Sequence, residues 1–195
     1  MVSTETSLKR CVKLILSSLK GTRLYSYIHA FSMARDIRSG VFTEPEIYLL
    51  PLFVREGESV IDGGANYGLY SYHLSRIVGT SGLVFAFEPI QYTFSTLSKV
   101  CKLLNLQNVQ LFDVALGDYS GECTLEVPLQ KGGHLMGGQA YLSTRNDTHG
   151  DVESQVRWTT TSNYTSRINK LDDLIDLNLA KSITLIKLDI EGSEF

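Results

Sequence analysis

Hydrophobic positions recur at helical spacing through the first quarter of the chain. The later of two such stretches predicts a helix over residues 24–37. Thr43, followed three positions later by Glu46, predicts a capping box that begins a third helix. Residues 1–42 are therefore expected to form a helical segment docked on the domain that follows. The first apolar stripe, Leu8, Val12, Ile15 and Leu19, predicts an amphipathic helix docked on the domain, and a helix on a membrane surface is the less supported alternative.

The pattern changes after residue 57 to short apolar runs separated by helical stretches. Residues 83–87 are apolar at every position, as a parallel strand covered by helices on both faces requires. This alternation predicts an α/β domain over residues 43–195, with right-handed crossovers and a doubly wound, mostly parallel sheet. The predicted strands are 59–62, 83–87, 109–115 and 183–190, and the helices between them are 69–78 and 94 to about 105.

The stretch from residue 122 to about 166 lacks this periodicity and contains two Gly-Gly pairs. It is expected to form a hairpin and a flexible loop, followed by a short helix at 171–175. His134, between the Gly-Gly pairs, is a candidate base on that loop or a solvated histidine. Trp158 and Tyr141 are candidates either for an acceptor pocket or for strand packing.

Composition narrows the class of protein. The chain has 195 residues, of which 43% are hydrophobic and 20% charged, as expected of one globular domain. Its net charge of -3 provides no long-range basic field that would attract the protein to nucleic acid or to anionic lipid. Three cysteines that are far apart fit neither a disulfide framework nor a zinc site and favour a reducing, cytoplasmic location. Nothing approaches the run of about 18 apolar residues that a transmembrane helix needs.

All four predicted strands finish at or beside a carboxylate, at Asp62, Glu88, Asp113 and Asp189. Ligands of open parallel sheets bind outside the carboxyl ends of the strands. Since uncompensated carboxylates repel phosphates, this rim is better suited to a ligand that carries hydroxyls and positive charge.

The turn after the first strand reads Asp-Gly-Gly-Ala-Asn-Tyr-Gly over residues 62–68. Its glycines do not follow the i, i+2, i+5 spacing of the dinucleotide fingerprint, and no Lys-Ser or Lys-Thr of a P-loop follows them. Glu88 follows Gly68 by 20 residues, where a carboxylate can accept hydrogen bonds from both hydroxyls of a ribose.

These segments together resemble the FkbM-type methyltransferases, a family of Rossmann-like enzymes that use S-adenosylmethionine. The resemblance extends from about Glu44 to Phe195. It implies that Asp62, Gly64, Asn66 and Gly68 hold the methionine end of the cofactor, that Glu88 binds the ribose, and that Asp113 to Ala115 lie beside the adenine. The matching motifs are VIDGGANYG at 60–68, FEP at 87–89, ALGD at 115–118, LDDL at 171–174 and IKLDIEG at 186–192.

Two-residue alternation puts Lys187, Asp189 and Glu191 on one side of the last predicted strand, as candidate catalytic residues. Lys187 would neutralise the two acids or shift the pKa of one of them so that it acts as a base. Alternatively, Lys187 reaches solvent at a sheet edge and the acids cap the next helix. The resemblance implies O-methylation of a small-molecule hydroxyl, on a sugar or a polyketide-like natural product. Asp189 and Glu191 carry hard oxygen ligands suited to a divalent metal, but two acids without a third ligand are weak evidence, and no metal site is predicted.

The resemblance also implies a seven-stranded sheet, of which only four parallel strands are visible. We therefore expect a chain truncated at its C-terminus after the fourth parallel strand, with little turnover on its own. The alternative is a non-catalytic nucleoside-binding module or inactive fragment. An NAD-linked oxidoreductase ranks third because the glycine spacing does not fit.

Overall fold

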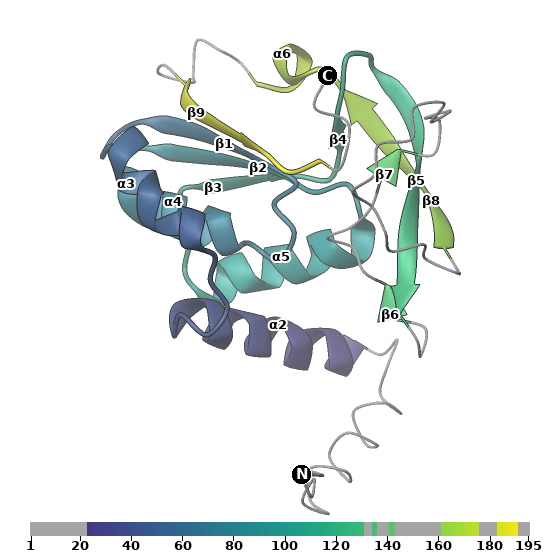
Figure 1. Ribbon diagram of the computed structural model, residues 1–195, viewed down its shortest axis with the longest axis horizontal. Helices are drawn as coiled ribbons and strands as arrows, with labels where there is room; N and C mark the ends of the chain where they lie inside the picture. The colour runs from purple at the N-terminus through teal and green to yellow at the C-terminus, as the bar shows by residue number, and fades with distance from the viewer. Residues whose placement is uncertain (1–22, 131–133, 136–140, 143–160, 176–182, 191–195) are drawn as a thin grey trace, which may run out of the picture.

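The computed structural model describes residues 23–130, 134–135, 141–142, 161–175 and 183–190. Helices and strands alternate through the first part of this chain (Figure 1). In order they are α2 (Arg23–Arg38), the 3-10 helix η1 (Pro45–Leu49), α3 (Leu50–Phe53), β1 (Ser59–Gly63), α4 (Leu69–Val78), β2 (Leu83–Phe87), α5 (Gln91–Leu103) and β3 (Val109–Phe112). They are followed by β4 (Ala115–Leu116), β5 (Gly121–Gln130), β6 (His134–Leu135), β7 (Tyr141–Leu142), β8 (Thr161–Asn169), α6 (Leu171–Leu174) and β9 (Ile183–Leu188).

A four-stranded parallel sheet with the order β3-β2-β1-β9 forms the centre of the fold. Every residue of β1 is buried, and Gly63 at its end pairs with Phe87 of β2 and Leu188 of β9. The carboxyl ends of β1, β2 and β9 therefore meet at one edge. This Rossmann-like α/β arrangement confirms the fold class predicted from the sequence.

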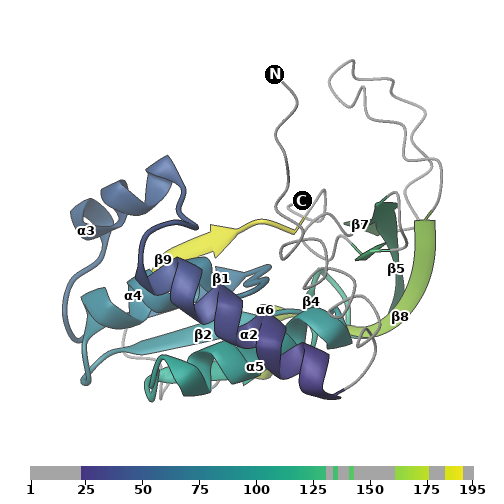
Figure 2. The ribbon, with the colours of Figure 1, turned by 90° about the horizontal axis from the view of Figure 1, so that it is seen from below.

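Helices cover both faces of this sheet. The core on one face joins α4 and α5 to α2 and the α3 segment, with Ala34, Leu74 and Val100 among its buried members. The core on the other face contains Phe87, together with partly buried Leu171 and Leu174 of α6. Figure 2 shows α2 lying across α5, outside the α4 and α5 layer.

A second sheet stands beside the first and contains the region expected to be a hairpin and a flexible loop. Its main feature is a long antiparallel pair between β5 and β8, in which Gly121 faces Ile168 and Pro128 faces Thr161. His134 lies in β6 and pairs with Gln130, so its backbone belongs to a strand rather than to a loop. The prediction underestimated the strand content because the two partners are far apart in sequence.

Two predicted boundaries were wrong in detail. The single strand expected over 109–115 is divided into β3 and β4, and β4 pairs with β8 of the second sheet. The capping box at Thr43 and Glu46 does not form, because η1 begins after Glu44 and has no side-chain cap. The carboxylate of Glu44 instead accepts a hydrogen bond from the Tyr70 hydroxyl at 2.7 Å.

The other predicted elements agree closely with the structure. The helix expected over 24–37 is α2, and those over 69–78 and 171–175 are α4 and α6. The helix proposed for residues 8–19 lies outside the described residues. None of the helices that the structure describes is long and apolar enough to cross a bilayer.

Candidate functional site

The turn between β1 and α4 is tightly folded. Gly64, Asn66 and Gly68 have φ values of 68°, 48° and 91°, in the left-handed region that glycine and asparagine tolerate best. A side chain at Gly64 would clash with the backbone carbonyl of Asp189, and one at Gly68 would lie 2.8 Å from Leu97 Cδ1 of α5. The turn is therefore held closely between the end of β9 and helix α5.

Glu88 follows β2 at the same edge and is only 3% exposed. Its carboxylate accepts hydrogen bonds from the backbone N–H of Asn66 at 3.0 Å and of Ile90 at 2.9 Å. Burial raises the pKa of Glu88 to about 7, although these two N–H donors act in the opposite direction. Glu88 thus ties the glycine turn to the end of β2.

Asp62 is completely buried at the end of β1. The Ser71 hydroxyl of α4 donates a hydrogen bond of 2.6 Å to its Oδ2, and the Lys187 ammonium lies 3.3 Å from its Oδ1. Lys187 also donates hydrogen bonds to the carbonyls of Gly63 at 3.2 Å and Gly64 at 3.0 Å. The lysine does not reach solvent at a sheet edge, because its side chain is only 16% exposed.

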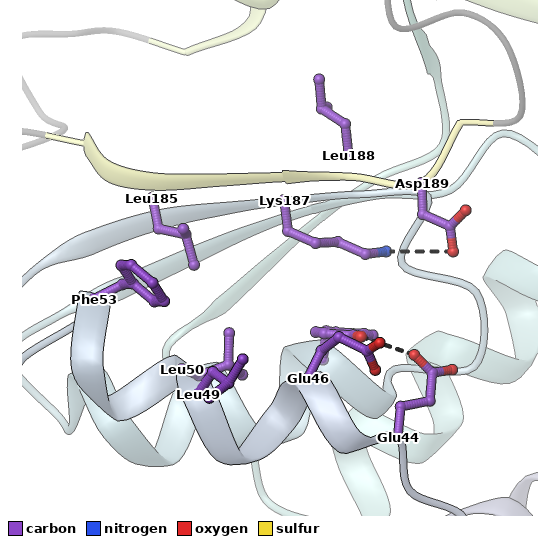
Figure 3. Close-up of a pocket in the computed structure, with 10 residues that line it drawn as sticks. Glu44, Glu46, Leu49, Leu50, Phe53, Leu185, Lys187, Leu188 and Asp189 are labelled. Atoms are coloured by element: carbon purple, nitrogen blue, oxygen red, sulfur yellow. Dashed lines mark hydrogen bonds and ion pairs between the residues drawn. The ribbon is translucent and has the colours of Figure 1, made fainter.

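Asp189 is the exposed carboxylate of this group. Its side chain is 62% exposed and lies 3.9 Å from the Lys187 ammonium. Lys187 in turn lies 4.8 Å from the centre of the Tyr70 ring. As predicted from the alternation, Lys187 and Asp189 point to the same side of β9, whereas Leu188 points to the other (Figure 3). Glu191 lies outside the described residues.

These side chains form the polar end of a groove of about 670 Å³ between β9 and the η1–α3 segment. Glu44 and Glu46 add negative charge at this end, and Leu49, Phe53 and Leu185 line the apolar remainder (Figure 3). The rim next to the glycine turn is therefore polar and acidic.

Asp113 and Ala115 differ in their surroundings. Asp113 follows β3 at the same edge as Glu88, but its carboxylate forms an exposed ion pair of 2.6 Å with Arg167 of β8. Ala115 is 8% exposed and belongs to a buried cluster with Ile90. Their assignment to the adenine remains a prediction.

An aromatic cluster links α2 to the glycine turn. The His29 Nδ1 lies 3.0 Å from the Tyr92 hydroxyl of α5, and its ring meets Tyr67 edge-on with centres 5.1 Å apart. Tyr25 also stacks with His29, with ring centres 6.2 Å apart. Sequence reasoning missed this contact, because His29 and Tyr92 are 63 residues apart and no local pattern relates them.

Comparisons with known proteins agree with the arrangement of these motifs. Residues 62–195 match the model of the methyltransferase FkbM domain. A curated relative, "Methyltransferase 1" of Beauveria bassiana (strain ARSEF 2860), is 24% identical over 137 residues, covering 69% of this chain and 55% of the relative. The chain thus spans about half the length of that relative.

Solved structures with partial similarity include a putative rRNA-methylase from Clostridium thermocellum, at 16% identity and a TM-score of 0.34, covering 45% of this chain and 72% of the other. A SAM dependent methyltransferase from Aquifex aeolicus is 26% identical, with a TM-score of 0.30 and coverage of 40% and 45%. The family model matches well over half of the chain, so the protein belongs to the FkbM methyltransferase family.

Proposed function

We propose that the protein is an S-adenosylmethionine-dependent methyltransferase that acts on a hydroxyl group of a small molecule. The observation that supports this most directly is the junction of the glycine turn with Glu88, whose carboxylate accepts the Asn66 N–H. At this junction the backbone of the turn can approach a ligand closely, and the Glu88 carboxylate can accept hydrogen bonds from both hydroxyls of a ribose. Family membership supports the same cofactor.

The groups around the turn fit this cofactor chemically. Each oxygen of Glu88 accepts one backbone hydrogen bond and keeps a lone pair for a ribose hydroxyl. The buried Asn66 Oδ1 has no hydrogen-bond partner among the described residues, so it is available to a donor such as an amino group. Glu88 would hold the ribose, and the turn over residues 62–68 would hold the methionine portion.

Lys187 has a positioning role in this proposal. Its ammonium forms an ion pair with Asp62 and donates hydrogen bonds to the carbonyls of Gly63 and Gly64. A lysine held in this way stabilises the turn and offsets the buried charge of Asp62. It is poorly placed to take a proton from an acceptor.

Asp189 is the group that we assign to the acceptor. It is exposed, lies at the carboxyl end of β9, and contacts the glycine turn through its backbone. Bound S-adenosylmethionine supplies a methyl group on a sulfonium, whose C–S bond breaks as the new C–O bond forms. The Asp189 carboxylate would orient the acceptor hydroxyl and receive its proton, so that charge balances. Sugars and polyketide-like natural products both present such hydroxyls.

Calorimetric titration with S-adenosylmethionine tests the cofactor assignment. We expect binding that is lost in Glu88→Ala and kept in Glu122→Ala, which alters an exposed carboxylate of β5. NAD should not bind. Absence of binding to a folded chain would contradict the proposal.

Methyl transfer is tested separately, with S-adenosylmethionine labelled in the methyl group and a panel of sugar and phenolic hydroxyl acceptors. Transfer that falls in Asp189→Asn while cofactor binding persists would support the assigned roles. Cofactor binding without transfer to any acceptor would favour a non-catalytic binding module.

A further inference from the structure

Helix α2 has an exposed apolar side next to its buried apolar face. One face is buried against the domain, with Ala30, Ala34 and Ile37 at most 5% exposed. An apolar surface wider than the face that a helix buries against its own domain is usually covered by something else. The other face is exposed and is called the outer stripe here; it consists of Leu24, Tyr27, Ile28 and Phe31, which are 56%, 60%, 37% and 63% exposed.

The outer stripe has the spacing of a single helix face and continues into basic residues. Its members follow one another at intervals of three, one and three residues, so they lie along one side of α2. Arg35 and Arg38 follow Phe31 by four and seven residues, which places them on the same side, and both are exposed. Arg35 also forms an ion pair of 2.8 Å with Asp36.

Helix α5 extends this surface. The Lys99 ammonium lies 5.4 Å from the centre of the Tyr27 ring. A groove of about 510 Å³ between the two helices is lined by Tyr27, Lys99, Lys102 and Leu103, of which Leu103 is 49% exposed. Apolar and basic side chains of α2 and α5 therefore share the outermost layer of the fold, where Figure 2 shows α2 in front of α5.

Charge is distributed unevenly along the chain. The whole protein carries 18 basic and 21 acidic residues. Because nearly all of the acidic residues come after α2, that part of the chain is strongly acidic. The first 38 residues are basic: they contain Lys9, Arg10, Lys13, Lys20, Arg23, Arg35 and Arg38, against only Glu5 and Asp36.

We propose that the outer stripe of α2 docks on an anionic lipid bilayer. The apolar side chains would enter the boundary between headgroups and acyl chains, and Arg35, Arg38 and Lys102 would contact anionic headgroups. Aromatic residues flanked by basic ones suit this interface. A second copy of the chain suits it less well, because pairing through this face would bring like charges together.

Flotation of the 195-residue protein with lipid vesicles tests this proposal. We expect binding to phosphatidylcholine vesicles that contain about a third phosphatidylserine, and little binding to phosphatidylcholine alone. The variant Phe31→Glu should lower the partition coefficient about tenfold or more. Tyr119→Glu is the matched control, since Tyr119 is 43% exposed but lies between β4 and β5, and it should bind like the unmodified chain.

Replacing the basic residues separates charge from apolar contact. Arg38→Gln should weaken binding about fivefold, and raising the salt concentration should weaken it further. Circular dichroism and binding of S-adenosylhomocysteine report whether each variant is folded.

Three results would overturn the proposal. The first is no binding to the anionic vesicles, and the second is equal binding by the folded Phe31→Glu variant. The third is a dimer in sedimentation experiments that Phe31→Glu converts to a monomer, which would assign the outer stripe to a second copy of the chain.

Discussion

The Lys187 ammonium lies 3.3 Å from Asp62 Oδ1, although the two residues come from strands that are far apart in sequence. Asp62 is fully buried, and its other oxygen accepts the Ser71 hydroxyl. Because a buried carboxylate is costly without a nearby cation, Lys187 makes an ionised Asp62 tolerable inside the fold. The same ammonium fixes the carbonyls of Gly63 and Gly64, so one side chain joins β9 to the glycine turn.

Replacing Lys187 with methionine should therefore lower the free energy of unfolding by about 3 kcal/mol or more, because Asp62 would keep its buried charge without a partner. Urea denaturation measures this change. The double variant Asp62→Asn with Lys187→Met should recover part of the loss. Lys102→Met alters an exposed lysine of α5 and should cost less than about 0.5 kcal/mol. Equal effects of the two lysine variants would contradict this role.

Replacing Gly64 with alanine should lower the free energy of unfolding much more than replacing Gly40 with alanine. Both glycines have positive φ, at 68° and 73°, so alanine at either position incurs similar backbone strain. Only Gly64 would also clash with the Asp189 carbonyl, whereas nothing lies within 4 Å of a Cβ at Gly40. We expect Gly40→Ala to cost about 1–2 kcal/mol and Gly64→Ala clearly more in urea denaturation. Similar costs would mean that the turn relaxes away from β9.

Glu88 should make both stability and cofactor binding depend on pH. Its folded pKa of about 7 exceeds the ordinary value of 4.5, so between these values the folded chain holds a proton that the unfolded chain has lost. The resulting stabilisation is complete below the ordinary pKa and is lost as the pH rises through about 7. Glu88→Gln should remove this dependence in unfolding experiments, and Glu122→Gln should keep it.

Binding of S-adenosylhomocysteine should show the opposite trend with pH. Ribose hydroxyls donate hydrogen bonds to an ionised carboxylate, so we expect affinity to increase as Glu88 ionises, by up to about tenfold per pH unit below its pKa. Calorimetry over this range measures the effect. Affinity that is independent of pH in the unmodified protein would indicate that Glu88 does not contact the ligand.

The hydrogen bond between His29 and Tyr92 should couple α2 to α5. His29→Phe keeps an aromatic ring but removes the hydrogen bond of 3.0 Å, and Tyr92→Phe removes its partner. A double-mutant cycle on the free energy of unfolding should give a coupling of about 0.5–1.5 kcal/mol. Strictly additive effects would mean that the hydrogen bond does not contribute to stability.

The parallel sheet was predictable because each strand carries its own signal. The apolar run of β2 and the periodicity of α4 are local, and the structure reproduces their predicted bounds. The positions of the carboxylates at the strand ends were also predictable, because the residues that follow parallel strands lie at the same edge of the sheet. The prediction thus placed Asp62, Glu88 and Asp189 at one edge of the sheet, where the structure has them.

Contacts between distant segments were not predictable in the same way. The long pairing of β5 with β8 crosses a stretch without periodicity, and the division of 109–115 into two strands depends on β4 pairing with β8. Sequence alternation placed Lys187 near the acids, but only packing determines that its ammonium is enclosed and has several acceptors. The Glu44 carboxylate likewise bonds to Tyr70 rather than to its own helix end.

The position of β9 in the chain has a consequence for folding. Strand β1 and the glycine turn lie early in the chain. Strand β9, which pairs with β1 on the side away from β2, lies more than a hundred residues later. Until that strand arrives, Asp62 lacks its cation and the turn lacks the carbonyl that closes over Gly64. Contacts of such long sequence separation form slowly. The glycine turn should therefore acquire its final geometry among the last steps of folding, after the β1-β2-β3 portion is already in place.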